Sequence, residues 1–322
     1  MPIIFPAAAH EADRENEGEE GMGNLREGLT GRFMAALAAL LLSVLWVAPA
    51  SAQQCDRACL GGLITQYVDA MVAKDSSRLP LASKVRVVED TQEIKLGEGV
   101  WKSVTARTDF RHDYLDTTRQ IAASHVVLKE GVNQILLSLL LHVTDGKIGG
   151  IETLVQRITP ASRWQPTELG GPIRGMEDAV PAGKRQPREA MIRTALTYTE
   201  GLRVGSFIDG GTPFAPGTYR VENGVITAGP GCGRGDCDPY AQRIMVHPSI
   251  LAKVAAVDEE KGVVLLWMNF GHTNSYEPGN SLVTFEAFKV WGDQIHSILA
   301  FFRTMPIATP RFWPASDPLP KP

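Results

Sequence analysis

The sequence predicts an α+β fold made of two domains in tandem, because one order of elements occurs twice along the chain. In each copy an amphipathic helix comes first, a Pro-x-Ala segment follows, and a hairpin with a tight turn closes the unit. A stretch rich in proline, glycine and charge, residues 159–187, separates the copies. The predicted domains therefore span residues 53–158 and 188–306.

The first copy begins with a predicted helix over residues 55–75. Its apolar side chains recur at intervals of three and four, the spacing of one helical face: Leu60, Leu63, Ile64, Tyr67, Val68, Met71 and Val72. Strands are expected at residues 124–129, 134–144 and 147–157. The dipeptide Asp-Gly at 145–146 separates the last two strands and favours a two-residue hairpin turn.

The second copy repeats this order with a helix at 189–202 and strands at 262–269, 282–291 and 294–303. Here Gly-Asp at 292–293 occupies the hairpin turn. The segments after the two helices correspond at four positions: Pro80 with Pro213, Ala82 with Ala215, Arg86 with Arg220 after a slip of one residue, and Glu89 with Glu222. A repeat of this kind predicts two copies of one structural unit.

Residues 1–52 are interpreted as a leader that ends in a secretory signal peptide, residues 33–52. The apolar core is shorter than the roughly 20 residues of a membrane span. Two arginines precede it, and Ala-Ser-Ala at 50–52 is a small-x-small cleavage site. We therefore expect an exported protein, periplasmic or secreted, that begins near Gln53 and keeps no stable membrane span. An uncleaved anchor helix is the alternative.

The start of translation has two candidates, Met1 and Met22. An acidic stretch, residues 10–20, follows Met1, and acidic residues are unfavourable before a signal core. Met22 gives the conventional order of a short basic segment followed by the apolar core, so it is the favoured start.

The charge balance argues against nucleic acid as a partner. The leader holds 3 of the 32 basic and 7 of the 36 acidic residues, so 29 of each remain after cleavage. A protein of zero formal charge with no basic run lacks the electrostatic footprint of a nucleic-acid-binding surface. The remaining length suits two domains of ordinary size.

All four cysteines follow the predicted cleavage site, and an exported chain with an even number of cysteines predicts disulfides. Local pairing of Cys55 with Cys59 and of Cys232 with Cys237 is favoured among three possible connectivities. A zinc site is the alternative, but these spacings fit zinc ligation poorly. We therefore expect no metal.

Two segments outside the repeats carry no periodic pattern. The linker at 159–187 is expected to cover surface rather than to fill a core. The Pro-rich tail, residues 307–322, is expected to pack in extended form or to be disordered.

The pattern resembles the SnoaL-like domains of the nuclear-transport-factor-2-like superfamily, and more closely an uncharacterised SnoaL-like family of secreted fungal and bacterial proteins. The resemblance rests on short matching stretches along residues 55–314: Ala58-Cys59-Leu60, Tyr67-Val68-Asp69-Ala70, Gly97-x-Gly99-x-Trp101, Asp145-Gly146-Lys147-Ile148, Tyr219-Arg220-x-Glu222-Asn223-Gly224 and Phe270-x-His272. It implies two cone-shaped domains, each with helices packed on a strongly bent antiparallel sheet. It carries no established reaction.

The resemblance also implies a small apolar or aromatic ligand in the cone and no cofactor. Where such domains are enzymes, a carboxylate or histidine in the pocket exchanges protons, because apolar surroundings move its pKa toward neutrality. His272 matches a family position at the end of an apolar strand and is the first catalytic candidate. A surface histidine at a strand end is the alternative.

Tyr219, Arg220 and Glu222 form a second constellation on one predicted strand. Side chains alternate across a strand, so Arg220 and Glu222 share one face and Tyr219 faces the other. Glu222 is a catalytic candidate, and Arg220, Tyr219 and Trp101 are candidates for the ligand pocket. A structural Arg220–Glu222 ion pair is the alternative.

The densest polar cluster lies at residues 108–118, which are expected to cross the mouth of the first cone. His112 is a catalytic candidate there and Tyr114 a pocket candidate, while a solvated loop is the alternative. His125 and His142 are interpreted as structural residues.

These observations predict a cofactor-independent lyase, dehydratase or isomerase acting on a small apolar or aromatic molecule. The alternative is a non-catalytic module that binds a hydrophobic ligand or a protein. Because related domains dimerise through their sheets, the two cones are expected to pack as an internal pseudo-dimer.

Overall fold

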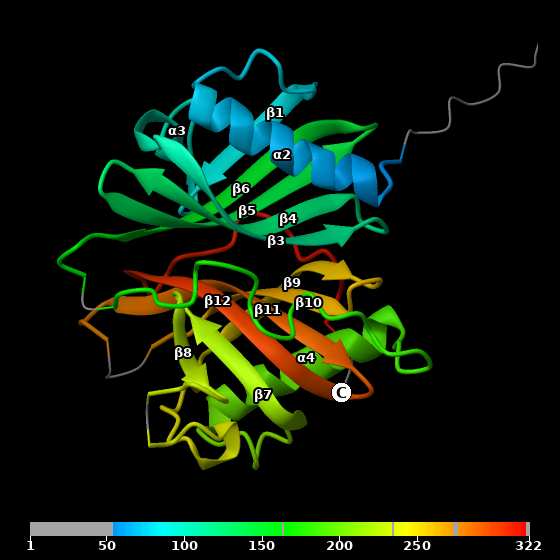
Figure 1. The fold of residues 1–322 in the computed structure, drawn as a ribbon, viewed down its shortest axis with the longest axis vertical. Coiled ribbons are helices and arrows are strands. Elements are labelled where there is room, and N and C mark those ends of the chain that lie inside the picture. The colour runs from blue at the N-terminus through cyan, green and yellow to red at the C-terminus, as the bar shows by residue number, and fades with distance from the viewer. Residues whose placement is uncertain (1–53, 163, 234, 273–275, 320–322) are drawn as a thin grey trace, which may run out of the picture. The chain divides into compact units, whose positions relative to one another are not determined.

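The computed structural model describes residues 54–319 except 163, 234 and 273–275. The predicted signal peptide and both candidate start sites lie outside the described residues. The described chain forms two sheet-rich domains in tandem, each with one six-stranded sheet and one long helix (Figure 1). No helix in the described part of the chain is long and apolar enough to span a membrane.

The first domain follows the predicted order of elements. Its helices are α2 (Arg57–Ala73) and the short α3 (Val100–Ser103), and its strands are β1 (Leu81–Glu89), β2 (Gln92–Glu93), β3 (Ala106–Asp116), β4 (Ile121–Glu130), β5 (Asn133–Thr144) and β6 (Lys147–Ile158). The amphipathic pattern of the sequence forms α2, whose apolar stripe is buried.

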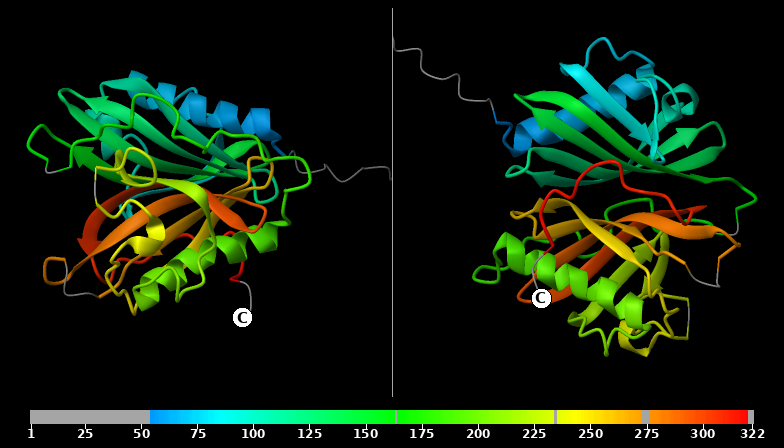
Figure 2. Two further views of the ribbon diagram at one scale, coloured as in Figure 1. Left: turned by 60° about the horizontal axis from the view of Figure 1, so that its bottom comes forward. Right: turned by 180° about the vertical axis from the view of Figure 1, so that it is seen from behind.

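The second domain repeats this order with α4 (Arg188–Val204) and a short 3-10 helix at Pro239–Ala241. Its strands are β7 (Phe214–Glu222), β8 (Val225–Ala228), β9 (Leu251–Asp258), β10 (Val263–Asn269), β11 (Asn280–Trp291) and β12 (Gln294–Pro306). In Figure 2 each long helix runs across its own twisted sheet.

Both sheets have the same topology, and neither is fully antiparallel. The strand orders are β2-β1-β6-β5-β4-β3 and β8-β7-β12-β11-β10-β9. The pairs β1–β6 and β7–β12 run parallel, which corrects the expectation of an antiparallel sheet. The strand that follows each long helix lies beside the last strand of its sheet and runs in the same direction, so this pair is parallel.

The registers show how closely the two domains repeat. Leu81 pairs with Ile148 as Phe214 pairs with Ile295, and Glu89 pairs with Thr153 as Glu222 pairs with Ala300. This register makes Glu89 the counterpart of Glu222. Each of these strand pairs has one shift of register. On the same side of that shift, Arg86 pairs with Gly150 and Tyr219 pairs with Ser297. The predicted match of Arg86 with Arg220 is therefore wrong, and Arg86 corresponds to Tyr219.

The turns of the closing hairpins agree with the sequence. Asp145 and Gly146 both adopt positive φ, and so do Gly292 and Asp293. Two consecutive residues of positive φ match the right-handed twist of a hairpin, which explains the choice of Gly and Asp at both sites.

The segment at 108–118 is not a loop across a cone mouth, because most of it belongs to strand β3. Phe110, His112 and Tyr114 alternate with residues of the opposite face and are buried. The charges between them concealed this strand period of two. Strand β9 was not predicted either.

Three clusters of buried side chains hold the domains together. One lies between α2 and the first sheet, and a second lies between α4 and the second sheet. The third combines residues of both sheets, and in it the ring of Phe301 lies 6.0 Å from that of Phe110 and 4.7 Å from that of His125. Each sheet therefore buries one face against its own helix and its opposite face against the sheet of the other domain.

Two equivalent ion pairs join the domains, and each domain supplies the arginine of one and the aspartate of the other. Arg57 at the start of α2 binds Asp258 at the end of β9, with an N–O distance of 2.6 Å. Arg188 at the start of α4 binds Asp116 at the end of β3, also at 2.6 Å. Each aspartate also accepts a backbone N–H from the other domain. Such mutual contacts are those expected of an approximate two-fold axis.

The linker and the tail both pack on the domains. Ile173 and Met176 are buried in the cluster between the sheets, so the expectation that the linker covers surface alone is wrong. In the tail, Arg311 forms a buried bidentate ion pair with Glu152 at 2.9 and 3.0 Å. The described part of the tail, up to residue 319, packs in extended form.

Candidate functional site

A cavity with a volume of about 720 Å³ lies mainly in the second domain. Its walls come from α4, from β7, β11 and β12, and from the segment that precedes β9. Gln156 and Ile158 of β6 and Trp164 of the linker complete the wall. Apolar lining residues are Leu202, Phe207, Ile244, Phe270, Leu282, Ala300 and Phe302, and polar ones include Tyr198, Arg220, Glu222, Gln242, His247, Tyr276, Thr284 and Glu286. A cavity of this size, with apolar and aromatic side chains beside polar groups, is within the range of small-molecule sites.

Arg220 lies at the centre of the polar wall and is held by several acceptors. Its guanidinium donates to Thr227 Oγ1 at 2.8 Å, to the Tyr198 hydroxyl at 3.0 Å and to Gln242 Oε1 at 2.6 Å. Glu222 lies 3.6 Å from it on the same face, as the strand alternation predicted. The charge of this buried guanidinium is thus balanced by a carboxylate and by fixed dipoles.

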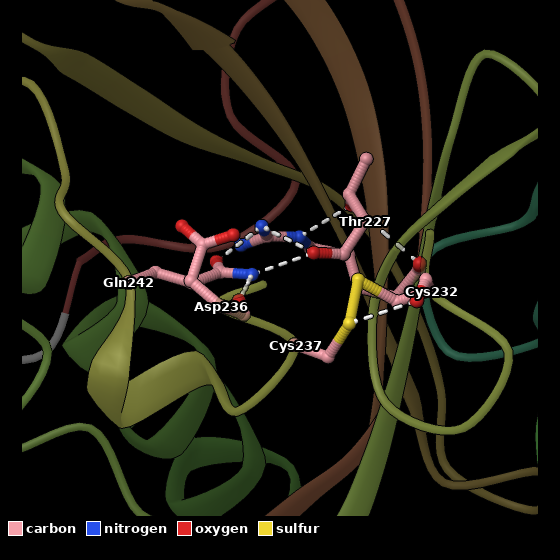
Figure 3. The surroundings of a disulfide bond; sticks show 6 residues. Thr227, Cys232, Asp236, Cys237 and Gln242 are labelled. Carbon is pink, nitrogen blue, oxygen red and sulfur yellow. Dashed lines mark hydrogen bonds between the residues drawn. A yellow bond between two sulfur atoms is a disulfide. The ribbon is translucent and has the colours of Figure 1, made fainter. Parts of the chain in front are cut away.

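The second disulfide loop supports this arrangement (Figure 3). Gln242 donates to the carbonyl oxygens of Thr227 at 2.6 Å and of Asp236 at 2.9 Å. Asp236 precedes Cys237, which is bonded to Cys232. The loop therefore positions Gln242, and Gln242 in turn positions Arg220.

Glu286 is the most perturbed acid of the site. It is 1% exposed, and its Oε1 has no hydrogen-bond partner among the described residues. Burial, assisted by the nearby charge of Glu222, raises the pKa of Glu286 to about 8, although Arg220 and Tyr198 oppose the shift. At pH 7 the group is therefore mostly a neutral carboxylic acid, which can donate a hydrogen bond.

His247 is the second group of the cavity with an unused position. Its side chain is buried, and its Nδ1 has no hydrogen-bond partner among the described residues. Burial lowers the pKa of His247, so the ring is neutral at pH 7. Its ring lies 4.9 Å from that of Phe270 and stacks on Tyr276 at 6.1 Å.

The predicted catalytic residues do not come together. His272 is exposed and does not line the cavity, and its backbone N–H donates to Ser249 Oγ at 2.9 Å. His112 lies in the first domain, and Glu222 lines the cavity of the second. The three residues share no site in this structure.

His112 is completely enclosed and engaged at both ring nitrogens. Its Nδ1 lies 2.5 Å from Glu177, and its Nε2 accepts the backbone N–H of Ile173 at 2.9 Å. Burial raises the pKa of Glu177, but hydrogen bonds from His112 and Lys261 outweigh this and hold it at about 2. The arrangement ties the linker to β3 and leaves no room for a ligand.

The predicted pocket residues divide in the same way. Arg220 lines the cavity. Tyr219 belongs to the cluster between the sheets and donates to Glu168 at 3.2 Å, and Tyr114 bonds His125 there at 3.0 Å. Trp101 fills the core beneath α2, where its indole donates to Tyr67 at 2.9 Å.

The two local disulfides are present as predicted, between Cys55 and Cys59 and between Cys232 and Cys237. Within the described residues, no group of three or more His, Cys, Asp or Glu side chains is arranged to hold a metal ion.

Sequence reasoning missed both Glu286 and His247. A signal for Glu286 was available, because it is the one acid in a strand that is more than half apolar and shares the period of two with Leu282 and Thr284. No comparable signal marked His247, which lies in an irregular segment between β8 and β9 and is brought to the cavity by tertiary packing alone.

Comparisons with known proteins give one match to a family model and no activity. Residues 184–302, from the start of α4 into β12, match the model of a family described as a domain of unknown function (DUF8021). A search of curated proteins found no match.

Proposed function

We propose that the second domain binds a small apolar or aromatic molecule in its cavity and that Glu286 acts there as a general acid. The observation that carries the proposal is a buried carboxyl group with an unused hydrogen-bonding oxygen beside a cavity of about 720 Å³. Buried polar groups in proteins are nearly always satisfied, so an exception with a shifted pKa is characteristic of functional sites.

The chemistry follows from the protonation state. A neutral carboxylic acid donates to a carbonyl or hydroxyl oxygen of the ligand and stabilises negative charge that develops on it. Arg220 and Glu222 balance each other, so the proton of Glu286 is the available one. This arrangement suits an isomerase, a dehydratase or another lyase whose reaction moves a proton, with no cofactor required for the proton transfer.

We also propose that both domains are SnoaL-like units joined as an internal pseudo-dimer. The shared strand order, the matching registers and the reciprocal ion pairs of Arg57 and Arg188 support this. Export is a further part of the proposal, and two disulfides in the described chain support it because such bonds persist in oxidising compartments.

Binding of a neutral fluorescent probe, N-phenyl-1-naphthylamine, tests the cavity. Leu282→Trp places bulk in the cavity wall and should abolish the binding. The matched control is Leu251→Trp, an exposed leucine of the same sheet outside the cavity, which should bind like the unchanged protein. Equal binding by both variants would show that the probe does not use the cavity.

Deuterium exchange tests the acid. In an aryl ketone such as 2-acetylnaphthalene, Glu286 would donate its proton to the carbonyl oxygen while solvent water takes the proton from the neighbouring carbon. Deuteration of that carbon by D2O and return of the oxygen-bound proton to Glu286 would complete the exchange. The unchanged protein should promote this exchange, and Glu286→Leu should lose the activity. Glu286→Leu removes the proton donor and keeps the site apolar.

A non-catalytic binding module is the second candidate. It is favoured by the guanidinium of Arg220, whose hydrogen bonds are directed to Thr227, Tyr198 and Gln242 rather than into the cavity. Probe binding without exchange for any of a panel of carbonyl compounds would support this candidate over catalysis.

A further inference from the structure

The cavity presents two unused hydrogen-bonding atoms, and they come from different walls. Glu286 belongs to β11 in the sheet, whereas His247 belongs to the irregular segment that precedes β9. Glu286 Oε1 and His247 Nδ1 are both buried and both lack a partner among the described residues. A ligand that satisfied only one of them would leave the other desolvated and unpaired, which costs free energy.

The imidazole is held in place by contacts that leave Nδ1 unused. The backbone N–H of His247 donates to Leu202 O at 2.9 Å, and its ring packs between the rings of Phe270 and Tyr276. Burial lowers the pKa of this histidine, and the backbone carbonyl of Phe270 partly offsets the shift. A neutral ring with its N–H toward that carbonyl keeps Nδ1 as an acceptor.

The two unused positions are therefore complementary in kind. The protonated carboxyl of Glu286 donates, whereas His247 Nδ1 accepts. Aromatic side chains, among them Phe207, Phe270 and Phe302, line the wall of the same cavity. Of the charged residues in the cavity wall, Arg220 pairs with Glu222 at 3.6 Å and Arg303 pairs with Asp90. The remaining two, Arg243 and Asp236, have opposite charges, so the cavity calls for no net charge on the ligand.

Building on the proposed function, we propose that the ligand is a neutral aromatic or polycyclic molecule with a polar group at each end. An oxygen at one end accepts a hydrogen bond from Glu286. A hydroxyl or N–H at the other end donates to His247 Nδ1. His247 is thus a specificity-determining residue that distinguishes hydroxylated ligands from their unsubstituted analogues.

Three matched pairs of ketones test this on the full chain. Each pair shares one ring system and differs by one distal hydroxyl: acetophenone with 4-hydroxyacetophenone, 2-acetylnaphthalene with 6-acetyl-2-naphthol, and 4-acetylbiphenyl with 4-acetyl-4′-hydroxybiphenyl. Three lengths are needed because the ligand's span is to be found by the experiment. Dissociation constants are measured by titration calorimetry at pH 6.5.

In at least one pair, the hydroxylated ketone should bind the unchanged protein about five- to tenfold more tightly than its analogue, the ratio expected for one hydrogen bond. His247→Phe should bring this ratio close to one, and the test does not depend on its affinity for the unsubstituted ketone because both ketones are compared on the same variant. His247→Asn, whose amide oxygen can replace the Nδ1 acceptor, should restore part of the ratio.

The Glu286 end is tested by pH. The groups beside this carboxyl are Arg220, Tyr198 and Glu222. Binding of the unsubstituted ketone should weaken above pH 8 as Glu286 ionises. Glu286→Gln retains an N–H donor, so its affinity should not change between pH 6 and 9.

The outcomes separate this inference from the function on which it rests. Ketone binding with a hydroxyl ratio near one in all three pairs, or a ratio that His247→Phe leaves intact, overturns the two-ended ligand while the cavity stays a binding site. Failure of every ketone to bind overturns both.

Discussion

Strand β5 of the first domain carries Leu139 three residues before its bulge, and strand β11 of the second carries Glu286 three residues before the equivalent bulge. Leu139 is part of the leucine-rich core beneath α2, whereas Glu286 lines a cavity beside α4. One architecture therefore supports a filled core in one copy and a polar cavity in the other. The difference supports the proposal that the second domain, and not the first, is the one that binds a ligand.

The helices show the same contrast at one pair of residues. Tyr67 and Tyr198 occupy the same place in two helices of 17 residues. The hydroxyl of Tyr67 accepts from the uncharged indole of Trp101, and the hydroxyl of Tyr198 accepts from the guanidinium of Arg220. The two domains thus differ in the partners of an equivalent tyrosine, while the order of their helices and strands is the same.

The largest expected effect comes from exchanging the side chains at the equivalent positions 139 and 286. Leu139→Glu places an unpaired carboxyl in the filled core and should lower the free energy of unfolding at pH 7 by about 4 kcal/mol. Glu286→Leu should instead raise it, because it removes a buried acid whose folded-state pKa is shifted. Urea denaturation measures both, and a loss of similar size in both variants would make Glu286 a structural residue like its counterpart.

The next effect is a pH dependence confined to the second domain. The pKa of Glu286 is raised from 4.5 to about 8 in the folded protein. Folding therefore favours the protonated form of Glu286. The contribution of this group to the free energy of unfolding is greatest at low pH and falls as pH rises from 4.5 to 8. Between pH 5 and 8 the loss should be about 3 kcal/mol.

Glu286→Gln is the control for this effect, since it should remove that part of the slope in urea denaturation at a series of pH values. The difference between the two proteins cancels the contributions of other titrating groups. Parallel pH profiles would contradict the raised pKa.

A smaller effect compares the two tyrosines. Tyr198→Phe removes the acceptor of a charged donor and should cost about 2 kcal/mol of unfolding free energy, whereas Tyr67→Phe removes a neutral bond and should cost about 1 kcal/mol. Thermal or urea denaturation of both variants gives the comparison. The reverse order would mean that Arg220 is readily resatisfied by water in the cavity.

The smallest effect concerns how the helices begin. Asp56 caps α2 by accepting the backbone N–H of Cys59 at 2.8 Å, whereas α4 follows Pro187 with no side-chain cap. Asp56→Ala should cost about 1 kcal/mol, and Pro187→Ala should lose no cap bond. Equal losses in urea denaturation would show that the difference at the helix starts has no energetic weight.

Local patterns in the sequence predicted much of the fold. The apolar stripes of α2 and α4 and the turns at 145–146 and 292–293 depend on neighbouring residues, and all four were predicted. Strand β3 was missed because charges hide its alternation, and the parallel pairing of β1 with β6 depends on contacts distant in sequence.

The residues of the site were predicted only where the alternation of side chains along one strand was enough to place them. Alternation placed Arg220 and Glu222 on one face, and they do line the cavity. His272 was chosen as a candidate and His247 was not considered, but the loops around the second sheet expose His272 and bury His247. Which histidine reaches a cavity depends on loop packing, which single-residue patterns do not encode.

The protonation state of Glu286 is the centre of this account, and carbon-13 NMR of glutamate carboxyl groups measures it directly. The signal is assigned by its disappearance in Glu286→Gln and is followed from pH 4 to pH 10. We predict a titration midpoint near pH 8, shifted further when 2-acetylnaphthalene is bound. A midpoint near 4.5 would mean that Glu286 is an ordinary carboxylate at neutral pH and would contradict its role as an acid.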